Sequence, residues 1–171
     1  MKKIKVNIND LKLNGLKLKS VDDSDVIIKK SGEFNNEYVY DIEVEDGFHT
    51  FLADNILAHN SCVFSSIITT KNESIGELFN RYYKFQIPEL NENGHEILNI
   101  NNEYTYTLNG KSKIKSVSRH KVSKDKWKIT VDNKNVEITG DHSIMVYRDG
   151  NVIECKPEDI KETDMLLIKK G

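Results

Sequence analysis

The sequence of 171 residues has little of several residue types that mark specialised folds. It contains two prolines, one tryptophan and two cysteines, Cys62 and Cys155. Two cysteines allow one disulfide but are too few for a zinc site with its usual Cys/His spacings, so we expect no metal site. We also expect no cofactor. No apolar run approaches the roughly 18–20 residues of a membrane span, and the Lys-rich start lacks the apolar stretch of a secretion signal. We therefore expect a cytoplasmic protein without a membrane partner.

Charge of neither sign dominates the chain. The formal net charge is -2, with 30% charged and 37% hydrophobic residues. This balance argues against a nucleic-acid partner, and we interpret the lysines of Met1–Ser20 as a solvated face. Because single domains typically run to about 100–200 residues, this length predicts one compact domain, which we expect to be monomeric.

Strand signals are the most frequent local pattern. β-branched and aromatic residues recur between turn-forming residues in four segments, namely 38–44, 127–131, 136–139 and 143–146. Asp54-Asn55 and Asp149-Gly150 predict tight hairpin turns, and residues 132–135 predict a longer one. The fold class expected from this pattern is mostly β.

One segment has a clear helical pattern. Ser74 is a good N-cap residue, and Glu77 three positions later completes a capping box. After Ser74, apolar side chains recur at helical spacing, at Ile75, Leu78, Phe79 and Tyr82. A second short helical turn is expected at 157–160. Residues 22–25 and 89–102 lack periodicity and are predicted to be loops. One or two short helices are therefore expected beside the strands.

The centre of the chain concentrates reactive residues, because His59, Asn60, Ser61 and Cys62 follow one another inside an apolar stretch. Asn can attack its own backbone carbonyl to form a succinimide, Cys can attack the preceding carbonyl to form a thioester, and His can transfer the protons. Both reactions break the main chain and need donors that the fold holds in place. Alone, the four residues also fit an ordinary turn followed by a small buried cysteine.

The surrounding segments resemble the motifs of inteins, which are protein-splicing domains. The C-terminal intein motifs are matched by residues 39–44, 49–53 and 55–60, followed by Ser61. The N-terminal motif is matched by Cys62, the stretch 67–70 and the helix 74–79. The Thr-x-x-His motif and the strand-turn-strand that follows it are matched by 139–142 and 147–167. The resemblance is weak over 1–30 and 86–105.

This resemblance implies the Hint fold, a compact horseshoe-like β-domain, with its two halves in reversed order. Residues 1–60 correspond to the C-terminal half of an intein and residues 62–171 to the N-terminal half, with Ser61 as the one extein residue between them. The chain looks like a single Hint domain over 1–171, similar to archaeal or phage mini or split inteins. Its length leaves no space for an endonuclease domain. We interpret it as an engineered circular permutant or a fusion of split halves.

The resemblance also implies roles at the junction before Cys62. Cys62 would be the nucleophile of an N-to-S acyl shift onto the Ser61 carbonyl. His142, with Thr139 bonded nearby, would protonate or distort the amide between Ser61 and Cys62. Asp41 resembles the aspartate that coordinates the two ends of the reaction.

At the other junction, Asn60 would cyclise and cleave the peptide bond that follows it. His59 and His49 would assist, and which of them acts at the leaving group stays open. Ser61 would accept the acyl group, so the expected partners are extein polypeptides at this position. Three further residues, Cys155, His95 and His120, are interpreted as structural.

The reversed order limits the chemistry of this chain. Ser61 would have to attack its own carbonyl and close a four-membered lactone, so ordinary splicing is not expected. Separate cleavages before Cys62 and after Asn60 remain feasible, as autocatalytic, single-turnover reactions. Two alternatives stay open: a Hedgehog-type or bacterial intein-like autoprocessing domain, which need not carry the His-Asn-Ser end, and an inert β-rich binding module.

Overall fold

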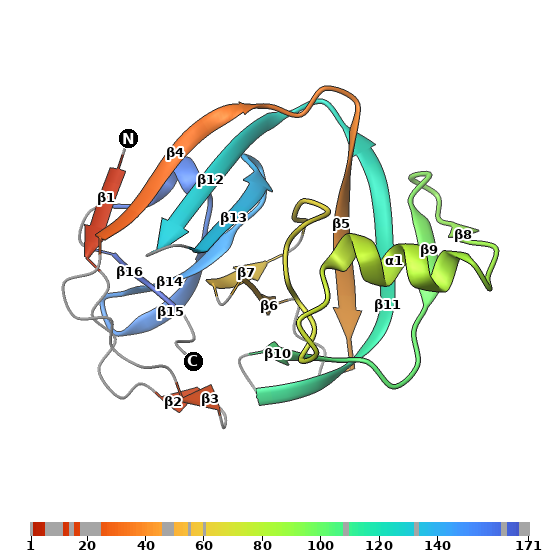
Figure 1. The fold of residues 1–171 in the computed structure, drawn as a ribbon. Helices are drawn as coiled ribbons and strands as arrows, with labels where there is room; N and C mark the ends of the chain where they lie inside the picture. The colour runs from red at the N-terminus through yellow and green to blue at the C-terminus, as the bar shows by residue number, and fades with distance from the viewer. Residues whose placement is uncertain are drawn as a thin grey trace.

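The computed structural model describes residues 2–5, 12–13, 16–17, 25–45, 50–54, 56–59, 61–107, 110–131, 134–161 and 164–167. These residues form sixteen β-strands, one α-helix and one 3-10 helix (Figure 1). The prediction of a mostly β protein is confirmed. Within the same residues, no helix is both long enough and apolar enough to cross a membrane.

The first sheet places two strands from the beginning of the chain beside two from its later part. Its order is β1 (Lys2–Lys5), β4 (Asp25–Glu33), β12 (Asp125–Val131) and β13 (Lys134–Thr139). Ile129 lies opposite Ile28 on one neighbour and Val136 on the other, and all three side chains are buried. Because side chains of paired residues point to the same face of a sheet, these three form one row of the core.

The second sheet is built around the long strand β11. It contains β10 (Tyr104–Thr107), β11 (Gly110–Val122), β9 (Glu96–Asn99) and β8 (Glu89–Leu90), with β5 (Glu37–Val44) paired to the other edge of β11. Along β5 the buried side chains of Tyr40, Ile42 and Val44 alternate with the more exposed Asp41 and Glu43. This period of two places the Asp41 side chain on the opposite face from the core.

The third sheet carries the segment that ends at the reactive centre. Its strands are β15 (Asn151–Cys155), β14 (Ile144–Arg148), β7 (Ile56–His59) and β6 (Thr50–Ala53), with β16 (Met165–Leu166) also paired to β14. A separate pair is formed by β2 (Lys12–Leu13) and β3 (Leu16–Lys17). Asp149 and Gly150, with φ of 51° and 83°, make the predicted tight turn between β14 and β15.

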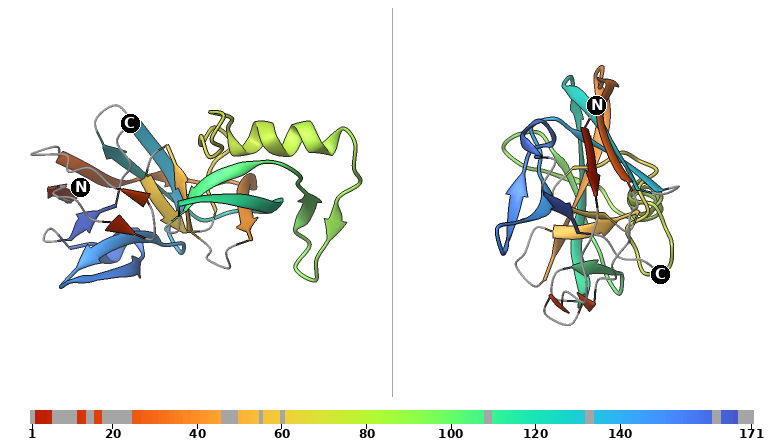
Figure 2. Two further views of the ribbon diagram at one scale, coloured as in Figure 1. Left: turned by 90° about the horizontal axis from the view of Figure 1, so that it is seen from below. Right: turned by 90° about the vertical axis from the view of Figure 1, so that its left-hand side faces the viewer.

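The helix α1 (Ile75–Tyr83) lies across β5 and β11, as both figures show (Figure 2). The Ser74 hydroxyl accepts a hydrogen bond from the Glu77 amide at 3.1 Å, as the capping pattern predicts. The buried stripe of the helix, Ile75, Leu78 and Phe79, faces the sheet. The expected second turn is the 3-10 helix η1 (Pro157–Asp159).

The loop predicted at 89–102 is wrong in part. Residues 89–102 contain strands β8 and β9, because β9 pairs with β11 and the pairing compensates for a polar sequence with weak strand propensity. Of the turn predicted at 132–135, Lys134 and Asn135 belong to β13, where they pair with Val131 and Thr130, and the other two residues lie outside the described ones. Of the loop predicted at 22–25, residue 25 belongs to β4 and the others lie outside the described residues.

Strands from the two ends of the chain interleave in all three large sheets. β4 pairs with β12, β5 with β11, and β7 with β14. Each of these pairs joins a strand before Ser61 to a strand after Cys62. The large core cluster accordingly draws side chains from both parts, such as Phe51 and Ile56 from the first and Phe79 and Ile114 from the second.

Candidate functional site

Cys62 lies between two strands that are far apart in the sequence. It forms single antiparallel bridges with Tyr40 of β5 and with Ile138 of β13. The Cys62 amide donates to the Tyr40 carbonyl at 2.8 Å, and the Tyr40 amide donates to the Cys62 carbonyl at the same distance. The side chain of Cys62 is fully buried. The peptide unit on either side of this residue is therefore held firmly by its neighbours.

The direction of these bridges fixes what surrounds Ser61. In antiparallel pairing, the residue before Cys62 lies beside the residues that follow its partners. Those residues are Asp41, after Tyr40, and Thr139, after Ile138. Ser61 is itself buried, with 2% of its surface exposed. Three of the residues singled out from the sequence thus meet at the bond between Ser61 and Cys62.

A cavity of about 550 Å³ opens at this point. The residues that line it include Asp41, Ser61, His95, His120, Lys124 and His142. The Asp41 carboxylate accepts a hydrogen bond from the amide of Ile42 at 2.8 Å, which orients it on its strand.

His142 is positioned by the turn that follows β13. Its Nδ1 lies 2.6 Å from the Thr139 hydroxyl, and its amide donates to the Thr139 carbonyl at 3.2 Å. Burial lowers the pKa of His142, although the charge of Asp141 opposes the shift. The imidazole is therefore neutral at neutral pH, and the bond at Nδ1 leaves its Nε2 for a second partner.

The Cys62 thiol is protonated in the resting protein. Burial raises its pKa far above the ordinary value, the Ser66 hydroxyl lowers it, and the charges of Asp41 and Asp54 raise it further. A thiol in this state is a weak nucleophile, because the thiolate is the reactive form. Any reaction of Cys62 thus needs its proton to be taken up as the sulfur attacks.

His59 ends strand β7 beside the turn that carries His142. The His59 amide donates to the carbonyl of Ser143 at 3.0 Å, and its Nε2 lies 3.3 Å from a Glu154 carboxylate oxygen. The charge of His59 also contributes to the pKa of His142. Asn60 and His49, the other residues predicted for this junction, lie outside the described residues.

Two histidines interpreted from the sequence as structural, His95 and His120, line the same cavity. The rings of His95 and His120 stack with centroids 3.8 Å apart and planes 9° apart. They face each other because Glu96 pairs with Arg119, which places the residues next to this pair opposite one another. Twenty-four positions separate the two histidines in the sequence, so only knowledge of the pairing between β9 and β11 reveals their proximity.

The two cysteines form neither a disulfide nor part of a metal site in the described residues. Cys62 and Cys155 are both free and buried, so the disulfide that composition allows is not formed. Cys155 lies near the Arg148 guanidinium, at 3.5 Å, away from the cavity. Across the described segments, no group of three or more His, Cys, Asp or Glu side chains is arranged to hold a metal ion.

Comparison with known proteins gives relatives but no family. No family model and no solved structure matches the chain. It is 26% identical over 127 residues to a DNA polymerase of Thermococcus aggregans and 28% identical over 127 residues to one of Thermococcus litoralis. Each match covers 70% of this chain, but only 7% and 8% of the relative. A transcription initiation factor IIB of Methanocaldococcus jannaschii is 32% identical over 78 residues, which are 45% of this chain and 11% of that protein.

Proposed function

We propose that the chain is an intein of the Hint fold whose two halves are joined in reversed order at Ser61. The observation that carries the proposal is the meeting of Asp41, Ser61 and His142 at one cavity, beside a buried Cys62 that two strands hold in place. Peptide-bond cleavage through a thioester requires a nucleophile and a group that transfers protons. Here Cys62 is the nucleophile, His142 is the acid/base group oriented by a hydroxyl, and Asp41 adds a carboxylate.

The comparisons support this proposal through the hosts of the matching segments. DNA polymerases and a transcription initiation factor have unrelated activities, yet a segment similar to this chain occupies about a tenth or less of each. A module inserted into different host proteins accounts for such a pattern. A polymerase activity is not favoured, because the chain spans only 7% and 8% of the two Thermococcus polymerases.

At the junction before Cys62, the thiol sulfur attacks the carbonyl carbon of Ser61. The new C–S bond forms, the C–N bond breaks, and the thiol proton ends on the amine of Cys62. His142 carries this proton, since its neutral imidazole can accept it and return it to the leaving nitrogen. Thr139 holds the ring in position, and Asp41 stands at the same cavity beside Ser61.

At the junction after Asn60, the side-chain amide nitrogen attacks the Asn60 carbonyl carbon and expels the amine of Ser61. His59 is adjacent in sequence, and Glu154 lies 3.3 Å from its Nε2 and fixes the position of the imidazole. His49 is the second candidate for this step. Single His49→Ala and His59→Ala variants distinguish which of the two histidines acts at the leaving group.

With one residue between the junctions, the chain performs end cleavages. Thiolysis or hydrolysis of the thioester releases a fragment that begins at Cys62, and succinimide formation releases one that ends at Asn60. The partner polypeptides of the full reaction are exteins inserted at Ser61. Each molecule reacts once, because its own backbone is the substrate.

Intact-mass measurement of the purified protein in excess dithiothreitol tests this proposal. We expect a fragment starting at Cys62 to appear with time, and Cys62→Ala to abolish it. Cys155→Ala is the matched control, since it removes the other buried thiol and should leave cleavage unchanged. A wild-type protein that keeps its full mass under these conditions, while folded, would exclude the thioester mechanism and favour an inert β-rich module.

A further inference from the structure

The Ser66 hydroxyl is an unusual group in the core. Only 1% of the surface of Ser66 is exposed, and within the described part of the chain its Oγ has no hydrogen-bond partner. A buried hydroxyl without a partner loses its interactions with water and gains nothing in return. An alanine would fill nearly the same space without this penalty.

The backbone holds Ser66 in place. Its amide donates to the Val63 carbonyl at 3.1 Å, and its carbonyl accepts from the Ile75 amide at 2.9 Å. The first bond closes the turn that directly follows Cys62, and the second ties this turn to the start of α1. The hydroxyl therefore cannot reach solvent without opening the turn or displacing the helix.

The same turn brings the hydroxyl to the Cys62 thiol. Among the described residues, the Ser66 hydroxyl is the one group that lowers the pKa of this thiol, against burial and the charges of Asp41 and Asp54. The hydroxyl is thus close enough to stabilise the deprotonated sulfur, but among the described residues its Oγ has no partner at the distance and angle of a full hydrogen bond in this state. The two groups are thus adjacent but not bonded while the sulfur is protonated.

We propose that Ser66 is a catalytic residue whose hydroxyl donates a hydrogen bond to the Cys62 sulfur as that sulfur loses its proton and attacks. The inference rests on the proposed function of Cys62. During the acyl shift the thiol proton leaves toward His142, negative charge develops on the sulfur, and the hydroxyl keeps its own proton throughout. The hydroxyl is idle in the ground state and bonded in the transition state, so its interaction accelerates the step.

The test compares Ser66→Ala with Ser65→Ala, the exposed neighbour on the same turn, both in a Cys155→Ala background that leaves one thiol. A hydrogen bond to a charged group corresponds to a roughly 10–100-fold effect on rate. We expect S66A to slow dithiothreitol cleavage before Cys62 by this factor, to raise the pH midpoint of that cleavage, and to leave cleavage after Asn60 unchanged. S65A should match the background in all three measurements.

Ser66→Thr, which keeps the hydroxyl, should keep the pH midpoint of the background protein. The thermal midpoint of S66A should equal or exceed that of the background, since an unpartnered polar group has been removed. An unchanged rate and pH profile in S66A, a shift in S66T as large as in S66A, or a lower thermal midpoint in S66A would each overturn the proposal.

A direct titration separates this inference from the proposed function. The ultraviolet absorbance of the thiolate reports the pKa of Cys62 whether or not the bond before it is cleaved. We expect a higher pKa in S66A than in the background protein. If the background protein shows no cleavage, the proposed function fails, and the titration still decides whether Ser66 acts on the Cys62 sulfur.

Discussion

The hydrogen bond between Thr139 and His142 determines how the imidazole faces the cavity. The Thr139 side chain is fully buried, and its hydroxyl lies 2.6 Å from His142 Nδ1. A ring held at one nitrogen presents the other nitrogen in a defined direction, which is what a proton carrier between the Cys62 sulfur and nitrogen needs.

Thr139→Val replaces the hydroxyl by a methyl group of similar volume, so the ring should lose its orientation while the core stays filled. We expect cleavage before Cys62 to slow by roughly tenfold, and His142→Ala to slow it by roughly 10²–10⁴-fold. Cleavage after Asn60 should persist in both variants. Asn60→Ala should instead abolish cleavage after residue 60 and leave cleavage before Cys62 in place. Mass spectrometry reads the two junctions separately. Equal loss at both junctions in a folded His142→Ala protein would contradict the assignment of His142 to the junction before Cys62 alone.

His120 gives a prediction for the dependence of stability on pH. Burial lowers its pKa to about 4, and the charges of His95, His142 and Lys124 add to the shift while Asp141 opposes it. In the unfolded chain a histidine titrates near about 6.5. Because the folded pKa is the lower one, the folded protein is favoured above about pH 6.5, and this advantage is lost as the pH falls toward 4.

We therefore expect His120→Gln to flatten the loss of unfolding free energy between pH 7 and pH 4.5, by on the order of 1–2 kcal/mol. Urea unfolding at the two pH values measures the effect in the variant and the wild type. An equal loss in the two proteins would show that His120 does not titrate differently on folding.

Among single residues, the sequence predicts those that belong to a contiguous motif. Local motifs point to Asp41, Ser61 and His142, and these three residues line one cavity. His95 and His120 are missed because nothing local distinguishes a cavity histidine from a surface one. Ser66 is missed because an unpartnered hydroxyl is a property of packing and leaves no trace in residue order.

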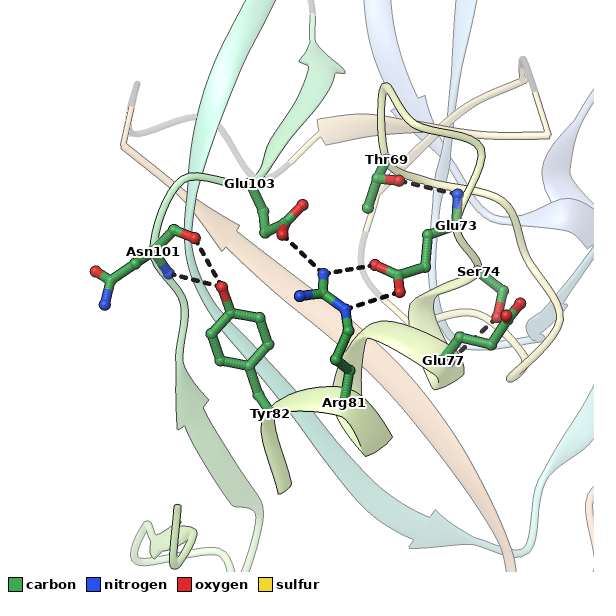
Figure 3. A network of polar contacts seen from close by, with 8 residues as sticks. All are labelled: Thr69, Glu73, Ser74, Glu77, Arg81, Tyr82, Asn101 and Glu103. Carbon is green, nitrogen blue, oxygen red and sulfur yellow. Dashed lines mark hydrogen bonds and ion pairs between the residues drawn. The ribbon is translucent and has the colours of Figure 1, made fainter. Parts of the chain in front are cut away.

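Among the elements, α1 carries an arginine that binds two carboxylates from other segments, beside Tyr82, whose hydroxyl donates to the Asn101 carbonyl (Figure 3). Arg81 binds both carboxylate oxygens of Glu73, at 2.9 and 3.0 Å, and reaches Glu103 at 2.7 Å. Glu103 is buried, with its side chain 7% exposed, whereas Arg81 is 44% exposed. The Glu73 amide in turn donates to the Thr69 hydroxyl at 2.9 Å, which links the helix to the segment after Cys62.

Arg81→Ala should therefore destabilise the protein mainly by leaving the Glu103 carboxylate buried without its partner. We expect a loss of about 1–3 kcal/mol in the free energy of unfolding, measured in urea. Lys115→Ala is the matched control, because the pair Lys115–Glu43 is about half exposed on both sides and should contribute under about 1 kcal/mol. A loss in Arg81→Ala no larger than in the control would mean that water already solvates Glu103.

The sequence predicts α1 and the apolar strands well, because each carries its own periodicity and cap or turn residues. Ser74, Glu77 and the stripe from Ile75 to Tyr82 suffice for the helix. Strand β9 is different, since its residues Glu96–Asn99 gain their order from pairing with β11. Such pairing is a long-range contact, and local propensity does not contain it.

For the whole molecule, the interleaving of strands has a direct consequence. β4, β5 and β7 come from residues 1–60, and each pairs with a strand from residues 62–171. Neither segment alone covers its apolar strand faces, so each should be unstable by itself and stable with the other.

Expressed separately, 1–60 and 62–171 should remain poorly structured and form a 1:1 complex on mixing. Circular dichroism and size-exclusion chromatography detect the gain of β structure and the change in size. Two segments that each fold alone, or that never associate, would contradict the view that they are complementary parts of one domain.

The central claim is that two junctions around Ser61 form one splicing site, and a variant with a peptide inserted there tests it most directly. The insert begins with Ser after Asn60 and ends directly before Cys62, so its own Ser hydroxyl can attack the thioester without closing a four-membered ring. We expect release of a cyclic peptide, lighter than the linear insert by one water, together with the two separate segments of the domain. Cys62→Ala should abolish the cyclic product. Recovery of the folded, full-length protein with the insert still in place, in mass spectra taken over the same time, would contradict the account.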